Sequence, residues 1–445
     1  MKRTVLLLAA AFAALSLSAQ NFDDHFEDAT LRLDYAICGD AHHQAIYLEQ
    51  LSRTSVWAGR RTNLAEPLLS GNGQVTVRSL ETGEILYRNS FSTLFQEWQT
   101  WEEAARVQRA YENCFQVPFP KEPVRIDLTL LDVHGQPTGS ISHVVDPADI
   151  LIRTVQDNGY ARETLHQGGD PAHAVDIVIL AEGYADDEKG KFLDDATRAM
   201  TAFLSHEPFT TMQGKITFRA VFSPSQESGV SIPHDGVWKN TALQCHYDTF
   251  YSARYLTTSS MRRVYDAIGT VPFEHIIILV NTPNYGGGGV YNNVTISAAD
   301  HPTFKEVLVH EFGHSFGGLA DEYAYDETAE IAYPSDTEPW EPNITTLKDF
   351  GRKWADLLPK GTPVPTPRDE VDTRQDVRRV WGTLTAEEKS LLNRKIGLYE
   401  GGGNQSKGVY RPVQECRMRI NECEDFCPVC TRAIVRMIEY YTGEE

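Results

Sequence analysis

The sequence is short of positive charge and of long apolar runs. It holds 41 lysine and arginine residues against 62 aspartate and glutamate residues, which gives a net charge of −21. A protein this acidic is repelled by the phosphates of nucleic acid and by anionic membranes. After residue 19, no stretch approaches the roughly 18 consecutive apolar residues of a membrane-spanning helix. We therefore predict neither a nucleic-acid partner nor a membrane anchor.

The first 19 residues form an apolar segment of their own. Lys2 and Arg3 precede an apolar run over residues 5–15, and small residues ending at Ala19 follow it. This order is typical of a Sec signal peptide, and the run is too short for a stable membrane span. We predict that residues 1–19 are removed on export, which makes the mature protein secreted, periplasmic or cell-surface. No cysteine stands at the cleavage point, which argues against a lipid anchor.

Cysteine is scarce, with seven residues in the chain, and four of them gather near the C-terminus. Cys416, Cys423, Cys427 and Cys430 have two interpretations, a zinc site of four thiolates or structural disulfides. Because an exported chain meets an oxidising compartment, we favour disulfides that tie the region around Met418 to a C-terminal helix. The sequence does not fix their connectivity.

Residues 20–165 are predicted to form an all-β sandwich domain. Alternating apolar and polar residues over 74–80 and 124–132, separated by turn clusters, are typical of antiparallel strands. A helical segment over residues 96–111 is expected to cover one edge. The region has no acid pair and no histidine cluster, which favours a binding or spacer module.

Residues 166–445 show a different pattern, in which strands and helices alternate. A continuous apolar run at residues 175–181 predicts a strand buried on both faces. Further strands are expected at residues 215–222 and 275–281, and helices at residues 186–205 and 261–268. The alternation predicts an α/β (α+β) domain.

The motif His310-Glu311-Phe312-Gly313-His314 follows three apolar residues in this second region. On a helix, His310 and His314 lie one turn apart on one face, so both imidazoles can bind a single Zn²⁺. Glu311 stands beside them, where its carboxylate can act on a water molecule. A core helix with two satisfied histidines would give Glu311 no role. The motif therefore predicts the zinc site of a hydrolase.

Gly317-Gly318 is expected to end this helix and to let the chain turn back with a third ligand. The spacing is similar to that of the metzincins, in which the third ligand stands three residues after the glycine. That position is Ala320 here. Asp321 follows it, which gives the pattern HExxHxxGxxxD, and Glu322 comes next. We favour Asp321 as the third ligand and keep Glu322 as the alternative.

At these residues the chain resembles the immunoglobulin-A peptidase family of zinc metallopeptidases. The most specific block is His310-Glu311-Phe312-Gly313-His314-Ser315-Phe316-Gly317-Gly318-Leu319-Ala320-Asp321-Glu322-Tyr323. Other blocks are Val178-Ile179-Leu180-Ala181-Glu182-Gly183-Tyr184, Tyr285-Gly286-Gly287-Gly288-Gly289, Tyr399-Glu400-Gly401-Gly402, Tyr410-Arg411-Pro412 and Cys416-Arg417-Met418-Arg419. The resemblance implies a metzincin-like zinc endopeptidase with secreted or surface-exposed use, without making immunoglobulin its substrate.

The sequence as a whole predicts a secreted zinc metalloendopeptidase. Zn²⁺ would be held by His310, His314 and Asp321, and Glu311 would be the general base. Met418 falls where a Met-turn would pass beneath the metal. Candidates for the oxyanion-stabilising donor are Tyr410, Arg411 and Arg419. Histidines without partners at ligand spacing are expected to lie outside the metal site, namely His206, His234, His246 and His275.

The substrate is expected to be a peptide or an extracellular protein, with a host glycoprotein as one candidate. Residues 290–297 are predicted to form an edge strand along the cleft, where an extended peptide can pair with it, although an ordinary surface hairpin fits the same residues. The four glycines at residues 286–289 lack the Gly-Lys-Ser/Thr of a phosphate loop. The alternative function is a non-catalytic adhesin or glycan-binding protein with a peptidase-like fold, in which Glu311 would have no purpose.

Overall fold

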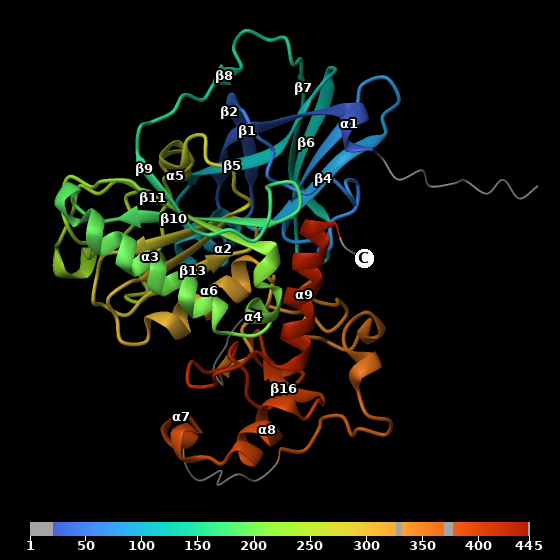
Figure 1. Ribbon diagram of the computed structural model, residues 1–445. Coiled ribbons are helices and arrows are strands. Elements are labelled where there is room, and N and C mark those ends of the chain that lie inside the picture. Colours follow the sequence, from blue (N-terminus) through green and yellow to red (C-terminus); the bar gives the residue numbers. More distant parts are fainter. Residues whose placement is uncertain (1–20, 326–331, 369–376, 444–445) are drawn as a thin grey trace, which may run out of the picture.

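The structure is a computed structural model that describes residues 21–325, 332–368 and 377–443. The predicted signal peptide, residues 1–19, lies outside the described residues. Among those that are described, no helix combines the length and apolar character needed to cross a bilayer. The described chain has a mixed α/β fold, with β sheets at its N-terminal end (Figure 1).

The N-terminal strands pair into two four-stranded sheets, in the orders β5-β1-β2-β8 and β4-β3-β6-β7. Both sheets face one core, in which Leu31 and Leu33 of β1 are buried together with Val77 of β3 and Ile126 of β6. Alternate residues of β6 face this core, since successive side chains of a strand point to opposite faces. The strands are β1 Phe26–Gly39, β2 Gln44–Thr54, β3 Gly73–Ser79, β4 Ile85–Phe91, β5 Arg109–Pro120, β6 Val124–Leu131, β7 Pro137–Val145 and β8 Arg153–Thr154.

Residues 96–111 differ from the single helix predicted for them. They hold the end of α2 (Leu94–Trp98) and a 3₁₀ turn, η1 (Glu102–Ala105), before β5 begins at Arg109. Thr93 caps α2, because its hydroxyl accepts a hydrogen bond from the Gln96 amide at 3.1 Å. From Arg109 onward the chain pairs with β1, and the hydrogen bonds of that ladder outweigh the local helical pattern.

A six-stranded sheet, in the order β13-β14-β12-β10-β11-β9, carries the rest of the fold. Strands β10 (Val175–Glu182), β11 (Ile216–Phe222), β12 (His275–Val280) and β14 (Val294–Ala298) are parallel. At the edges, β9 (Ala161–His166) and β13 (Gly287–Val290) pair antiparallel with their neighbours. All of β10 is buried, which confirms the strand predicted at residues 175–181.

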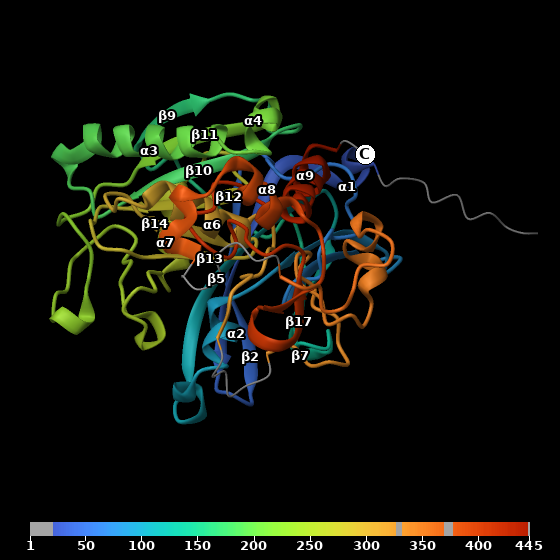
Figure 2. The ribbon, with the colours of Figure 1, turned by 90° about the horizontal axis from the view of Figure 1, so that it is seen from below.

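Helices cover both faces of this sheet. Ile177 and Ile179 of β10 share a core with α3 (Lys189–Leu204), α6 (Phe304–Ser315) and α9 (Pro428–Thr442). Val178 and Leu180 face the opposite core, which α5 (Met261–Ile268) covers. Figure 2 shows α3 lying along the outside of the sheet beside β11. The remaining helices are α1 (Phe22–His25), α4 (Phe209–Met212), α7 (Val377–Val380) and α8 (Ala386–Arg394).

The edge of the sheet differs from the prediction for residues 290–297. The chain reverses at Asn292, whose φ is +49°, so these residues belong to two strands. β13 is the edge strand, whereas β14 lies between β13 and β12 and is buried throughout. β14 lies inside the sheet because its apolar side chains are buried there. β13 consists mostly of glycines, which have no side chain to bury, and it lies at the edge.

The N-terminal sheets pack closely against the six-stranded sheet and its helices. The Arg32 guanidinium lies 2.7 Å from the Asp266 carboxylate of α5, and the Asn292 amide donates to the Ser90 carbonyl at 2.7 Å. β9 ends at His166 and pairs with β11, so the large sheet extends across the boundary predicted at residues 165–166. Helix α9 runs from the C-terminal lobe back to the N-terminal strands (Figure 1).

The C-terminal lobe is built on a small sheet in the order β15-β17-β16. Its strands are β15 Ala324–Tyr325, β16 Tyr399–Gly402 and β17 Asn404–Arg411. α8 begins at a capping box, in which the Thr385 hydroxyl accepts from the Glu388 amide and the Glu388 carboxylate accepts from the Thr385 amide. Residues 414–422 of the lobe and α6 line the same cleft.

Candidate metal centre and active site

Helix α6 carries His310, Glu311 and His314. Its opposite face buries Leu308 and Phe312 in the core below the large sheet, which fixes the rotation of the helix. Because residues four apart lie on one helix face, the two imidazoles then project together into a cleft. The Nε2 atoms of His310 and His314 are 3.1 Å apart.

The chain turns back directly after α6. Gly318 has a φ of +60°, in the left-handed region that glycine favours, and its amide donates to the His314 carbonyl at 3.1 Å. Asn343 holds the returning segment, residues 319–323, since its side-chain oxygen accepts from the Ala320 amide at 2.8 Å and its side-chain nitrogen donates to the Ala320 carbonyl at 2.9 Å. This return brings Asp321 over the imidazoles.

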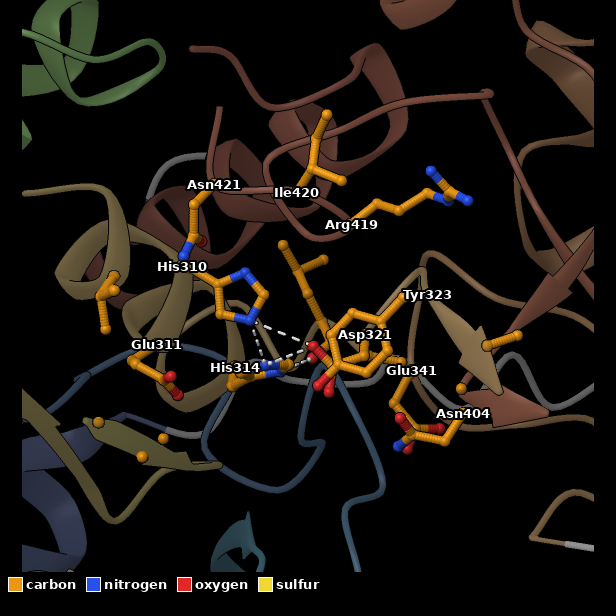
Figure 3. A pocket seen from close by; sticks show the side chains of 18 of the residues that line it. His310, Glu311, His314, Asp321, Tyr323, Glu341, Asn404, Arg419, Ile420 and Asn421 are labelled. Carbon is orange, nitrogen blue, oxygen red and sulfur yellow. Dashed lines mark hydrogen bonds and ion pairs between the residues drawn. The ribbon is translucent and has the colours of Figure 1, made fainter. Parts of the chain in front are cut away.

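Asp321 completes a compact cluster with the two histidines. Its Oδ1 atom lies 3.1 Å from His310 Nε2 and 3.2 Å from His314 Nε2 (Figure 3). In tetrahedral zinc sites, ligand atoms about 2.1 Å from the ion lie roughly 3.4 Å from one another. Three donor atoms at these separations therefore fit one metal ion with a fourth position left open.

Backbone carbonyls fix the orientation of both imidazoles. His310 Nδ1 lies 3.0 Å from the Arg417 carbonyl oxygen, and His314 Nδ1 lies 2.6 Å from the Leu319 carbonyl oxygen. A carbonyl only accepts, so each Nδ1 carries the proton and donates it, which leaves Nε2 as the metal-binding nitrogen. Two nitrogen lone pairs and a carboxylate oxygen facing one point require a cation there.

The Asp321 carboxylate favours the charged form of the imidazole of His314. Although burial alone would lower it, the pKa of His314 is raised to about 9 by the charge and hydrogen bond of Asp321. The same imidazoles hold the pKa of the Asp321 carboxyl well below its usual range, against the effect of burial. Tyr323 also bonds this carboxylate, and burial together with the Asp321 charge raises the pKa of its phenol.

Glu311 lies beside the histidines and lines the cleft (Figure 3). Burial raises the pKa of its carboxyl, while the nearby imidazoles and Arg254 act in the other direction. β13 passes close to it: a Cβ on Gly289 would lie 2.2 Å from the Glu311 carbonyl oxygen, and a Cβ on Gly287 would lie 3.1 Å from its Cγ. The glycine run therefore allows strand and helix to touch.

Glu322, the alternative third ligand, points away from the histidines. It is fully buried, and its Oε1 atom accepts from the Asn343 side chain at 3.0 Å and from the Cys430 thiol at 3.1 Å. Its amide donates to the Met418 carbonyl at 2.8 Å. Consecutive residues of an extended chain face opposite sides, so Asp321 and Glu322 reach two different clusters.

The cleft has a volume of about 1280 Å³ and draws its walls from distant parts of the chain. α6 and β13 line one side, and residues 414–422 line another. Gln96 and Glu97 of the N-terminal region also line it, which the sequence had not indicated, because a short helix in a β region carries no signal of a site. Burial raises the pKa of Glu97 to about 7, although the Tyr255 hydroxyl donates to it at 2.6 Å.

Of the three residues suggested as oxyanion donors, Arg419 lines the cleft. The Arg411 guanidinium is buried and donates to the carbonyls of Gly401 and Gln414, so it serves the backbone of the C-terminal lobe. Tyr410 lies on β17, where its backbone pairs with Thr345. Tyr323, whose side chain bonds the Asp321 carboxylate, also lines the cleft. No sequence pattern singled it out, because tyrosine is common in any fold.

Met418 lies beneath the metal-site helix. A Cβ placed on Gly313 would be 2.7 Å from the Met418 sulfur, so the thioether packs directly against α6. The other histidines lie elsewhere: His275 is buried against Phe316 and Tyr441, His206 contacts Arg417, and His234 bonds Asp248.

The disulfides favoured by the sequence are not formed. All seven cysteines lie within the described residues, and all have free thiols. Cys416, Cys427 and Cys430 gather around Glu322, with all four ligand atoms within 4.8 Å of one another. Cys423 is directed elsewhere, toward the Asn393 amide at 3.4 Å. The glutamate thus takes the place that the four-cysteine interpretation gave to Cys423.

Two histidines one helical turn apart with a glutamate beside them, all lining one cleft, are a pattern that hydrolytic enzymes use. The chain belongs to the IgA peptidase M64 family: the family model described as IgA Peptidase M64 matches residues 164–438, more than half of the chain. A second model, Peptidase M64 N-terminus, matches residues 21–140. A search of curated proteins finds no match. Members of the family are metallopeptidases, which agrees with the two groups of possible metal ligands in the structure.

Proposed function

We propose that this peptidase is an exported zinc endopeptidase. In this proposal, residues 1–19 are a signal peptide, residues 20–165 form a β-sandwich domain and residues 166–445 form a metzincin-like catalytic domain, with β9 at the boundary pairing into the sheet of the catalytic domain. The observation that carries the proposal is the convergence of His310 Nε2, His314 Nε2 and the Asp321 carboxylate on one point. The packing of Met418 against Gly313 supports the comparison with metzincins.

The donor set suits zinc. Two imidazoles and one carboxylate with an open fourth position are a usual set for catalytic zinc, whereas calcium and magnesium prefer oxygen ligands. When bound, zinc would act as a Lewis acid and would lower the pKa of a water molecule to about 7. His310, His314 and Asp321 would hold the ion, and the carbonyls of Arg417 and Leu319 would orient the imidazoles.

Glu311 is the proposed general base. Its carboxylate lies at the cleft beside the metal ligands and takes the proton of the attacking water as the water adds to the peptide carbonyl. The same carboxyl then gives the proton to the leaving amine. Tyr323 and Arg419 are the cleft residues that we propose as donors to the oxygen of the tetrahedral intermediate.

An extended stretch of protein is the proposed substrate. The cleft volume of about 1280 Å³ exceeds the roughly 300–1000 Å³ of typical small-molecule pockets. β13 is the last strand of the large sheet and lines this cleft, and its Gly287 carbonyl already accepts a hydrogen bond from the Leu256 amide at 3.4 Å. The proposal gives the rest of the strand a role in binding extended peptides, which edge strands hold through backbone hydrogen bonds whatever the ends of the peptide are. Export would direct the enzyme to extracellular proteins, with a host glycoprotein as one candidate.

The test of the zinc requirement uses the purified mature protein and unfolded casein. Cleavage should stop after removal of metal with a chelator and return on addition of zinc. Cleavage that continues at full rate in protein shown to be metal-free would refute the proposal.

The test of the endopeptidase assignment uses peptides blocked at both ends, beside the same peptides with free ends. Both sets should be cleaved at similar rates. Cleavage of the free-ended set alone would make the enzyme an exopeptidase and would remove the role given to β13.

A further inference from the structure

A second cluster of metal-binding side chains lies behind the catalytic one. Glu322, Cys416, Cys427 and Cys430 are all buried, and their ligand atoms lie within 4.8 Å of one another. The Sγ atoms of Cys416 and Cys430 are 3.9 Å apart, and Cys430 Sγ lies 3.1 Å from Glu322 Oε1. Glu322 follows α6, whereas the three cysteines lie close together near the C-terminus, within residues 416–430.

The distances suit a metal ion better than a disulfide. Sulfur atoms about 2.3 Å from a tetrahedral zinc ion lie roughly 3.8 Å from one another. Cys416 and Cys430 match this separation at 3.9 Å, whereas bonded sulfurs are about 2.05 Å apart. The cluster is therefore arranged as ligands around a point.

The buried carboxylate of Glu322 strengthens this conclusion. Its Oε2 atom is buried without a hydrogen-bond partner, although Oε1 has two. The nearby Arg411 guanidinium donates to backbone carbonyls. A buried carboxylate is costly unless a positive charge or a metal ion compensates it. Three thiols that can lose protons and one carboxylate make a complete ligand set for a divalent cation.

We propose that Glu322, Cys416, Cys427 and Cys430 form a second metal site, which holds zinc in a structural role. Three sulfur ligands exclude calcium and magnesium and favour zinc. Four protein ligands close the coordination shell and leave no position for a substrate, in contrast to the three-ligand cluster of His310, His314 and Asp321. This inference goes beyond the proposed catalytic site and does not depend on it.

A metal ion at the cysteine cluster would hold in place the segments that position His310, His314 and Asp321. Glu322 follows Asp321 in the chain, so fixing one carboxylate limits the other. Cys416 precedes Arg417, whose carbonyl oxygen lies 3.0 Å from His310 Nδ1. Cys427 and Cys430 lie at the start of α9, whose Ile434 packs in the core that contains α6. A metal ion here would tie the segment that carries Asp321 and Glu322, the segment around Met418 and α9 together.

The proposal also explains three unpaired thiols in an exported chain. Clustered thiols in an oxidising compartment form disulfides unless something occupies them. Bound zinc holds the sulfurs as separate ligands and shields them from oxidants. A disulfide between two of the three cysteines is the competing outcome, and the experiment must distinguish it.

The first experiment measures zinc and thiols in the full-length mature protein. Elemental analysis should find about two zinc ions per chain, and the double variant His310→Ala/His314→Ala should retain about one. Unfolding in chelator without reductant should expose all seven thiols to a thiol reagent. Fewer than seven thiols because two cluster cysteines are joined, or a double variant without zinc, would overturn the proposal.

A second measurement identifies the ligands, first in a protein that keeps all of its cysteines and then in single cysteine variants. Cobalt loaded into the His310→Ala/His314→Ala protein should show intense near-ultraviolet thiolate-to-cobalt absorption. Cys430→Ser should weaken this absorption, since only the thiolates of Cys416 and Cys427 would remain, whereas Cys423→Ser, outside the cluster, should keep it at full intensity. Absorption typical of oxygen or nitrogen ligands alone would contradict the assignment. Failure of peptide cleavage leaves these readouts unchanged, so the two proposals fail separately.

Discussion

Asp321 and Glu322 are neighbours in the chain, yet their carboxylates face two different clusters. Asp321 Oδ1 lies 3.1 Å from His310 Nε2, while Glu322 Oε1 lies 3.1 Å from Cys430 Sγ. One stretch of backbone thus separates a site open to the cleft from a buried one. The two acidic residues should respond differently to substitution.

Asp321→Ala should abolish peptide cleavage and weaken zinc binding at the histidine cluster by at least about 100-fold, because a direct ligand is lost. Glu322→Gln should lower zinc affinity mainly at the cysteine cluster, and it should weaken the histidine cluster much less than Asp321→Ala does. Zinc titration in metal buffers, followed by cleavage rate and by metal content, separates the two. If Glu322→Gln empties the histidine cluster and Asp321→Ala does not, the third ligand is wrongly assigned.

Glu311→Gln should lower kcat by about 10² to 10⁴ while zinc stays bound, since the amide keeps the shape of the side chain and cannot take a proton. Kinetics on blocked peptides, with metal content measured on the same sample, test this. Glu306→Gln, on the same helix, is the matched control and should cleave at nearly the normal rate. A metal-loaded Glu311→Gln enzyme of normal rate would rule out Glu311 as the base.

Gly289→Ala should damage the site, because the added Cβ would lie 2.2 Å from the Glu311 carbonyl oxygen and backbone atoms must move. Overpacking of this kind costs about 1–3 kcal/mol of stability, and displacement of α6 should lower the cleavage rate. Chemical denaturation and kinetics measure the two effects. Gly190→Ala in α3 is the control, since a Cβ there meets nothing within 4 Å and alanine favours a helix. If both variants had the same stability and cleavage rate, the contact between β13 and α6 would tolerate the added methyl group, and the prediction would be wrong.

His275 should make the protein less stable in acid. Burial lowers its pKa to about 3, whereas the unfolded chain binds the proton with a pKa of about 6.5. Between these values only the unfolded state is protonated, so stability falls as pH falls, by about 2 kcal/mol from pH 7 to pH 5. His275→Leu should remove this part of the pH dependence in denaturation curves. The exposed His42→Leu should leave it unchanged, and a wild-type slope in His275→Leu would contradict the assignment.

The sequence predicted those elements whose patterns are local. The apolar run at residues 175–181 forms β10, because a strand buried on both faces consists of apolar residues. The helix predicted at residues 261–268 forms α5, because a helix buried on one face has apolar residues at helical spacing. The sequence also singled out His310, Glu311, His314 and Asp321, which the fold brings to one cleft, because helix geometry relates i and i+4 without any tertiary knowledge.

Features that depend on distant pairing were missed or mistaken. An apolar strand at residues 294–298 suits an edge or an interior position, and neighbouring strands decided for the interior. Glu97 joins the cleft only through the packing of the N-terminal sheets, and Glu322 meets Cys430 across 108 residues of chain. A local sequence pattern does not indicate contacts between residues so far apart in the chain. For this reason the cysteines were assigned to disulfides.

The glycines of β13 affect how the enzyme would choose its substrates. Gly287, Gly288 and Gly289 line the cleft beside Glu311 and offer a substrate backbone atoms alone. A surface without side chains cannot distinguish one amino acid from another, so it would hold any extended segment in the same alignment. Discrimination must then come from the other walls, which include Gln96 and Arg419. Relatives that keep the glycine strand but change those walls would cut the same backbone geometry in different sequences.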